Sequence, residues 1–261
     1  MMLALMVISV VPLYMAILWS YTDEVNHYEV RTAGESIRLY RNGVHHSQWN
    51  PKRPLSGSIW DLLALPVMHR AQGSIRTACI LGFGAGAVAS VLQAVASIED
   101  LVGVELDAMH LSIADGFFNC AEGCELVAGD AVAWAQENKE TKYDFVLDDL
   151  YSEDNGIPVR CAPLDLEWFN CLASMVAPAG VLALNLVEPE KIPHLPPMKV
   201  GELKKRFPYR KIFSMKGYEN RVVAFSDCPF DPDSFADNLK QTLQNYPACR
   251  GVKQRYQIKD L

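Results

Sequence analysis

The chain has 261 residues, with 24 lysines and arginines against 31 aspartates and glutamates and a formal net charge of -7. Half of the residues are hydrophobic and 21% are charged, which excludes a disordered chain, a collagen-like repeat and a multi-span membrane protein. The acidic balance argues against a nucleic-acid partner, which would normally meet a basic face. The seven cysteines are scattered and odd in number, so we expect reduced thiols in a cytoplasmic protein and no metal site.

The amino terminus departs from this soluble composition. Residues 1–22 contain no charged side chain and are about long enough to span the hydrocarbon core of a bilayer. No basic residue precedes Arg31 and no small-residue cleavage pattern follows, which disfavours a cleaved signal peptide. One interpretation is a membrane anchor that tethers a cytoplasmic catalytic domain to the inner face of a membrane. A buried extension or a misassigned start is the alternative.

Residues 23–70 indicate a small β appendage followed by a lead-in helix. Residues 27–48 alternate between apolar and polar side chains, and Asn42-Gly43 is a hairpin signal. Residues 56–70 are rich in apolar helix formers, with Pro66 weakening the second half of the predicted helix.

Residues 71–261 alternate between apolar strand-like runs and helical runs. The expected strands are 78–84, 101–107, 124–130, 143–150, 180–187, 209–215 and 220–226, and the expected helices are 87–96, 108–118, 131–138, 163–177 and 234–246. Strands that are apolar throughout and separated by helices indicate a parallel sheet covered on both faces. The predicted fold class is α/β, with a Rossmann-like, seven-stranded, mostly parallel sheet that ends in an antiparallel hairpin.

Ligands of such sheets bind at the carboxyl ends of the strands, and a glycine turn follows the first strand there. Gly82, Gly84 and Gly86 leave room for a ligand to approach the backbone, although such a turn can also bind nothing. Glu105 closes the second strand about twenty residues later, where a carboxylate can accept hydrogen bonds from both ribose hydroxyls. The combined spacing predicts a nucleoside ligand.

Acidic residues also follow the third and fourth strands. Asp130, next to Ala131, could accept from an adenine amino group or cap the following helix. Asp148 and Asp149 must point to opposite faces of the sheet, so we expect one to face the ligand and the other to be solvated or to cap a neighbour. Asp144 lies at the wrong end of its strand and is expected to be structural. The G-x-G-x-G spacing favours S-adenosylmethionine or a relative over NAD.

The order of these segments resembles the spermidine synthase-like branch of the class I S-adenosylmethionine-dependent methyltransferase superfamily. The resemblance covers about two thirds of the chain. It is carried by VHHSQWNP at 44–51, ILGFGAG at 80–86, VELD at 104–107, GDA at 129–131, YDFVLDD at 143–149, GVLALNL at 180–186 and NRVVAF at 220–225. It implies S-adenosylmethionine or its decarboxylated form as cofactor, a small-molecule amine or other nucleophile as acceptor, and a homodimer.

The resemblance also implies roles for individual residues. Cofactor binding falls to Gly82, Gly84, Gly86, Glu105, Asp130, Ala131 and His46. In this scheme the glycines surround the methionine part, Glu105 holds the ribose and Asp130 contacts the adenine. His46 stands where the family commonly has a glutamine near the cofactor. It could act as a base, but one of two consecutive histidines is more often a solvated residue. Asp149 matches the acid that helps to deprotonate the attacking amine, because a carboxylate can orient an ammonium and then accept its proton.

Two departures from the family pattern bear on the reaction. Ala85 occupies the place where aminopropyltransferases usually carry an Asp that pairs with the amine of the decarboxylated cofactor. Ser152-Glu153 occupies the place of their Asp-Pro. We therefore expect methyl transfer from S-adenosylmethionine, whose carboxylate would meet no repelling acid at Ala85 and would be received by the backbone N–H groups of the loop. Aminopropyl transfer is the first alternative, and a catalytically degenerate nucleotide-binding module is the second. Residues 150–162 and the β appendage are expected to shape the acceptor pocket.

Overall fold

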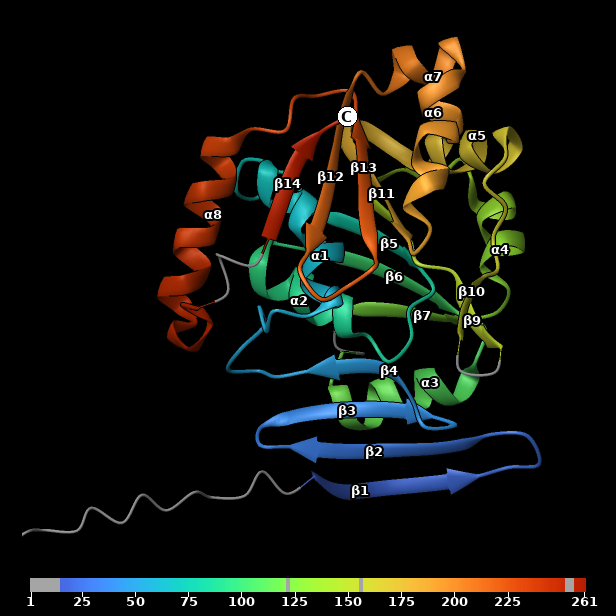
Figure 1. The fold of residues 1–261 in the computed structure, drawn as a ribbon, viewed down its shortest axis with the longest axis vertical. Coiled ribbons are helices and arrows are strands. Elements are labelled where there is room, and N and C mark those ends of the chain that lie inside the picture. The colour runs from blue at the N-terminus through green and yellow to red at the C-terminus, as the bar shows by residue number, and fades with distance from the viewer. Residues whose placement is uncertain (1–14, 121–122, 155–156, 252–255) are drawn as a thin grey trace, which may run out of the picture.

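A computed structural model describes residues 15–120, 123–154, 157–251 and 256–261 of the chain. In these residues a four-stranded sheet near the N-terminus lies beside a larger eight-stranded sheet, and a two-stranded hairpin completes the strands (Figure 1). The larger sheet carries helices on both faces, so the α/β class predicted from the sequence is confirmed.

The N-terminal sheet is an antiparallel meander in the order β1-β2-β3-β4. Its strands are β1 (Met15–Thr22), β2 (His27–Ala33), β3 (Ser36–Arg41) and β4 (Val44–Trp49). The turn between β3 and β4 has φ of 52° at Asn42 and 82° at Gly43. Positive φ at both central residues matches the right-handed twist of a two-residue hairpin, as the Asn-Gly signal predicts.

Strand β1 changes the interpretation of the apolar N-terminal segment. Residues 15–22 of that segment pair along β2, with Tyr21 opposite Tyr28, and the Trp19 ring lies 5.9 Å from the ring of Phe117. These residues therefore form a sheet edge and are not part of a spanning helix. Residues 1–14, the rest of the expected anchor, lie outside the described residues. Within the described part of the chain, no helix is long and apolar enough to cross a membrane.

The large sheet has the strand order β14-β12-β13-β11-β8-β5-β6-β7. Its strands are β5 (Thr77–Leu81), β6 (Asp100–Glu105), β7 (Cys124–Ala128), β8 (Tyr143–Asp148), β11 (Val176–Leu186), β12 (Tyr209–Met215), β13 (Arg221–Ser226) and β14 (Tyr256–Asp260). Strands β11, β8, β5, β6 and β7 pair in parallel. Strand β13 pairs antiparallel with β11, β12 pairs antiparallel with β13, and β14 pairs antiparallel with β12. All seven predicted strands are present. The eighth, β14, joins the edge of the sheet and is too short and exposed to be evident from its sequence.

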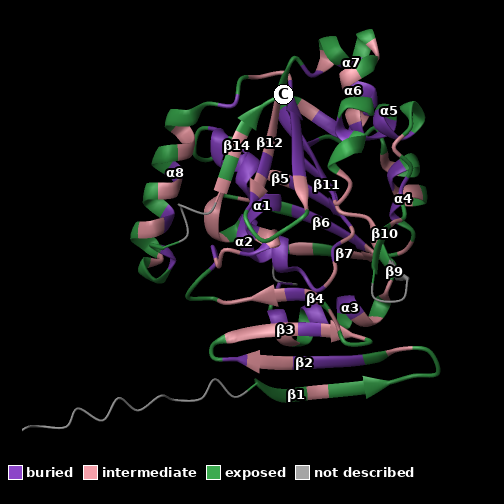
Figure 2. Ribbon diagram, in the orientation of Figure 1, coloured by how far each residue is buried: buried purple, intermediate pink, exposed green. Residues whose placement is uncertain are grey.

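Alternate side chains of each parallel strand enter two separate cores. Ile80 and Leu147 pack in one core and Leu81 and Val146 in the other, and Figure 2 shows β5 and β11 buried along most of their length. The first core contains side chains of α1 (Ile59–Ala64), α2 (Ala87–Val95), α3 (Ala108–Ile113) and α8 (Pro232–Asn245). The second contains side chains of α4 (Ala131–Asn138), α5 (Leu166–Met175) and α7 (Gly201–Arg206), with Met198 of the short α6 (Pro196–Lys199) packed against it.

Two local features shape the surroundings of the carboxyl ends of the strands. Helix α1 gives way to a 3-10 turn over Leu65–His69, because Pro66 supplies no backbone N–H for an α-helix. The chain after β8 forms a hairpin of β9 (Tyr151–Asp154) and β10 (Ile157–Arg160). This hairpin lies within residues 150–162, which the sequence analysis assigned to the acceptor pocket.

Candidate active site

A cavity of about 500 Å³ lies at the carboxyl ends of the parallel strands, a volume typical of small-molecule and cofactor sites. All predicted site residues except Gly86 line it: His46, Gly82, Gly84, Glu105, Asp130, Ala131 and Asp149. The strand order arranges them in a row, with the residues after β7 and β6 at one end and the residues after β8 and β11 at the other. The glycine turn after β5 is in the middle.

The glycine turn requires glycine for packing reasons at two positions. Gly82 has φ of 89°, and a Cβ atom there would lie 2.3 Å from the carbonyl oxygen of Asp149. Gly86 has φ of 80° and begins α2, where a Cβ atom would lie 2.3 Å from Cys120 Sγ. Gly82 thus brings the turn against the end of β8. Gly86 faces the protein interior and not the cavity, contrary to the role expected from the resemblance.

The backbone N–H groups of this loop are already engaged within the protein. The pairs are Gly82 and Phe83 with the carbonyl of Val104 at 3.0 and 3.1 Å, Gly84 with Glu105 Oε2 at 2.7 Å, Ala85 with Ser47 Oγ at 3.0 Å, and Gly86 with the carbonyl of Phe83 at 3.0 Å. The expectation that these groups would receive a cofactor carboxylate is therefore wrong for this conformation. The side chain of Ala85 is fully buried.

Glu105 is held in place by two backbone donors. Its Oε2 accepts from the N–H of Gly84 at 2.7 Å and its Oε1 accepts from the N–H of Asp107 at 3.0 Å. A carboxylate has about four acceptor positions, so two remain for a diol. Burial disfavours the charge, but the nearby ring of His110 and the two N–H groups outweigh it and hold the pKa of Glu105 below its ordinary value. Glu105 is therefore ionised and oriented before a ligand arrives.

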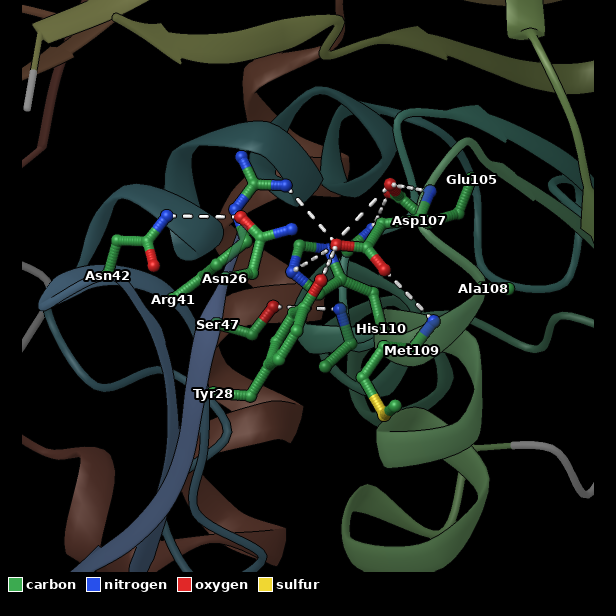
Figure 3. Close-up of polar contacts among 12 residues, drawn as sticks. Asn26, Tyr28, Arg41, Asn42, Ser47, Glu105, Asp107, Ala108, Met109 and His110 are labelled. Carbon is green, nitrogen blue, oxygen red and sulfur yellow. Dashed lines mark hydrogen bonds and ion pairs between the residues drawn. The ribbon is translucent and has the colours of Figure 1, made fainter. Parts of the chain in front are cut away.

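A polar cluster next to Glu105 joins the two sheets, and the sequence analysis did not identify it. Asp107 accepts from Tyr28 OH of β2 at 2.8 Å and from Arg41 Nη1 of β3 at 3.2 Å (Figure 3). Asp107 also caps α3. The buried ring of His110 lies 3.7 Å from Glu105 Oε1 and 3.6 Å from Asp107 Oδ2. A sequence signal for this cluster was available: two acids two residues apart, Glu105 and Asp107, with a histidine three residues later, His110.

Asp130 caps the helix that follows it, which is one of the two roles expected from the sequence. Its Oδ1 accepts from the N–H groups of Val132 at 2.8 Å and Ala133 at 3.0 Å, which makes it the N-cap of α4. The carboxylate also lines the cavity, next to Ala131. Capping fixes its position without using both oxygens, so Asp130 remains available for a donor at this end of the cavity.

Asp148 and Asp149 point to opposite faces of the sheet, as predicted for neighbours on a strand. Asp148 is fully buried, where it forms an ion pair with Arg160 of β10 and accepts from Trp168 Nε1 at 2.8 Å. Asp148 is not solvated, but its Oδ1 accepts from the N–H of the neighbouring Leu150 at 3.4 Å, in line with the alternative that it caps a neighbour. The arginine and the indole were not visible as further partners in the sequence. Asp149 faces the cavity.

The carboxyl group of Asp149 is in an environment that favours its protonated form more than water does. Its Oδ1 accepts from Asn185 Nδ2 at 2.8 Å. Burial raises the pKa of Asp149 to about 6, against the opposing effect of the hydrogen bond from Asn185. At neutral pH the group is thus ionised but close enough to its pKa to exchange a proton.

Two other predicted residues have clear places. His46 lines the cavity with its ring centre 5.1 Å from that of His110, and burial together with the charges of His110 and Arg41 lowers its pKa to about 3. It is therefore neutral at pH 7 and a weak base. Asp144 accepts from the N–H groups of Arg76 and Thr77 at 2.8 and 3.0 Å, a structural contact as expected. Among the residues described, no group of His, Cys, Asp or Glu is arranged to hold a metal ion.

Comparison with known proteins identifies the architecture. No established family profile matches the chain. It is 26% identical over 137 residues to an eEF1A lysine and N-terminal methyltransferase homolog of Drosophila melanogaster, and 28% identical over 165 residues to a probable polyamine aminopropyl transferase of Bifidobacterium longum. These alignments cover 50% and 62% of this chain but only 20% and 35% of the two relatives.

Solved structures match over nearly the whole chain. A probable spermidine synthase from Corynebacterium glutamicum has a TM-score of 0.71 at 19% identity, with 94% of this chain and 91% of that chain covered. A spermidine synthase in complex with the transition state analogue AdoDATO has a TM-score of 0.61 at 14% identity, with 91% and 87% covered. The chain therefore has a spermidine synthase-like fold.

Proposed function

We propose that the chain is a transferase that uses S-adenosylmethionine and transfers a group to an amine. The observation that carries this proposal is the placement of two carboxylates in one cavity. Glu105 is the last residue of β6 and Asp149 directly follows β8, one on each side of the glycine turn after β5. Two strand spacings separate them by about 10 Å, which leaves room for the reacting part of a nucleoside between a ribose acceptor and a general base.

The residues on one side of the glycine turn would bind the cofactor, and the residue on the other side would bind and deprotonate the acceptor. Glu105 would accept from the two ribose hydroxyls, and Asp130 would accept from the adenine amino group at the far end. Asp149 would bind the acceptor as an ammonium, remove its proton and leave the amine lone pair to attack. The cofactor held by Glu105 and Asp130 would supply the electrophilic carbon and, as its sulfur, the leaving group. The protein contributes mainly the alignment of the two reactants.

Methyl transfer is proposed over aminopropyl transfer because of Ala85. A site for the decarboxylated cofactor gains from an acid near its free ammonium, whereas an acid in that place repels the carboxylate of S-adenosylmethionine. Ala85 leaves the loop without such an acid. Since the N–H groups of the loop are occupied, the preference rests on the missing acid alone. Aminopropyl transfer is the second candidate, and the extensive fold similarity to a probable spermidine synthase favours it.

Titration calorimetry with three ligands tests the proposal: S-adenosylmethionine, its decarboxylated form and methylthioadenosine. We expect all three to bind, with S-adenosylmethionine at least as tight as the decarboxylated form. Clear preference for the decarboxylated form, together with conversion of putrescine to spermidine, would establish aminopropyl transfer instead. Binding without transfer to any of a panel of amines would support a degenerate nucleotide-binding module. No binding of any of the three would refute the proposal.

A further inference from the structure

The amide of Asn185 connects the proposed base to a second asparagine. Asn185 lies near the end of β11 and is 5% exposed. Its Nδ2 donates to Asp149 Oδ1 at 2.8 Å, and its Oδ1 accepts from Asn220 Nδ2 at 3.0 Å. All three residues line the cavity. Asp149 and Asn185 face the same side of the sheet. Each lies two residues after a side chain of the first core, Asp149 after Leu147 and Asn185 after Ala183.

These two hydrogen bonds determine which way the Asn185 amide faces. An amide has donors on nitrogen and acceptors on oxygen. The reverse orientation would set the Asn185 oxygen against the carboxylate of Asp149 and its nitrogen against the nitrogen of Asn220. Asn220 therefore selects the orientation that presents an N–H to Asp149.

The main chain of Asn185 is held as firmly as its side chain. Its carbonyl oxygen accepts from Tyr151 OH at 3.1 Å and from Arg160 Nη1 at 3.3 Å, both on the hairpin that follows β8. On the other side, β11 pairs with β13, where Asn185 is opposite Val222. Rotation of the amide away from Asp149 would therefore have to occur within a fixed backbone.

We propose that Asn185, oriented by Asn220, is the positioning residue of this site, occupying one oxygen of Asp149 and leaving the other for the attacking amine. This inference rests on the proposed function for its catalytic meaning. The donated N–H fixes the rotamer of the carboxylate and favours its ionised form. The other charged groups that act on Asp149 are Asp148 and Glu105, which disfavour its ionisation, and Arg160, which favours it.

Carboxyl-carbon NMR titration of the protein labelled with [¹³C]aspartate tests the inference without any cofactor or acceptor. Asp149→Asn assigns the resonance. In Asn185→Leu, which is similar in shape and lacks the donor, we expect the midpoint of Asp149 to rise by at least about one pH unit, a tenfold change in proton affinity. Asn220→Leu should give a smaller rise, because Asn185 remains but is no longer oriented. Asn170→Leu, at an exposed position on α5, should leave the midpoint unchanged.

The titration tests the role of Asn185 independently of the proposed function. An unchanged midpoint in Asn185→Leu and in Asn220→Leu would overturn the inference even if the protein proves to be a transferase. Should Asn185→Leu fail to fold, Asn220→Leu decides alone. If transfer is detected, the acidic limb of its pH–rate profile should shift with the titration midpoint, while the affinity for S-adenosylmethionine stays constant. Failure to bind S-adenosylmethionine would refute the proposed function and leave the titration result standing.

Discussion

Glu105 and Asp149 both line the cavity, but their surroundings shift their pKa values in opposite directions. Glu105 receives two backbone N–H groups and lies beside His110, and its pKa is lowered. Asp149 has a single described donor, from Asn185, and burial raises its pKa. The first arrangement suits a fixed hydrogen-bond acceptor and the second suits a group that exchanges protons.

Replacement of Glu105 tests ribose binding at this site. If the proposal is right, Glu105→Ala removes two charge-assisted hydrogen bonds to the ribose diol, each worth about 1.5–3 kcal/mol. We expect at least about a tenfold loss of S-adenosylmethionine affinity by calorimetry, with an unchanged circular dichroism spectrum. Glu99→Ala, at the opposite end of β6 in an exposed pair with Arg76, is the control and should bind normally. Equal affinities in the two variants would exclude Glu105 from the site.

The pH dependence of transfer tests the role of Asp149. A general base must be ionised to accept a proton, and the pKa of Asp149 is raised to about 6. We expect transfer to fall as the pH drops through about 6 and to be fully developed above about 7. Asp149→Asn should bind S-adenosylmethionine normally and transfer about 10²-fold more slowly or worse. A pH–rate profile that is flat between 5 and 8 would show that another group takes the proton.

At the scale of elements, the buried pair of Asp148 and Arg160 joins strand β8 to the hairpin that follows it. Trp168 of α5 donates to the same carboxylate, so three elements meet at one side chain. The side chains of Asp148 and Arg160 are 0% and 4% exposed, which makes an unpaired charge at either position costly. The contact therefore stabilises the wall of the cavity from the face opposite Asp149.

Asp148→Asn tests this junction. The change leaves a buried guanidinium without its partner, and we expect a loss of about 3–5 kcal/mol in the free energy of unfolding, measured by urea denaturation. The double variant Asp148→Asn with Arg160→Met should recover part of that loss, because it removes the unpaired charge. A single variant as stable as the original protein would mean that the ion pair contributes little.

At the scale of the whole molecule, the N-terminal sheet is attached to the large sheet beside the cavity. Tyr28 and Arg41 donate hydrogen bonds to Asp107, which lies two residues after Glu105. The ring of Trp19 in β1 lies against the rings of Tyr21 and Phe117. The appendage predicted from residues 23–70 is therefore larger than expected, and it includes a strand that begins at Met15.

Shortening the chain to different start points tests the role of β1. A chain that begins at residue 23 lacks β1 and exposes the edge of β2, while a chain that begins at residue 15 keeps both. We expect the shorter chain to lose roughly 2–3 kcal/mol from the packing of Trp19 alone, which lowers the melting temperature by about 4 °C or more. Equal melting temperatures in a calorimetric scan would show that β1 adds nothing to the fold.

The features that depend on local periodicity could be predicted from the sequence. Apolar runs separated by helical segments specified the seven predicted strands, and the period of two along a strand placed Asp148 and Asp149 on opposite faces. The Asn42-Gly43 pair specified a tight turn, and the glycine turn with Glu105 predicts a nucleoside site. Each of these follows from residues within about twenty positions of one another.

The pairing of side chains that are distant in the sequence could not be predicted, because it depends on how the elements pack together. Arg160 for Asp148, Tyr28 and Arg41 for Asp107, and Asn220 for Asn185 come from separate elements. The pairing of β14 with β12 and of β1 with β2 likewise depends on neighbours in the sheet. These contacts form because strand pairing brings elements together that are far apart in the chain, and local sequence patterns carry no information about that proximity.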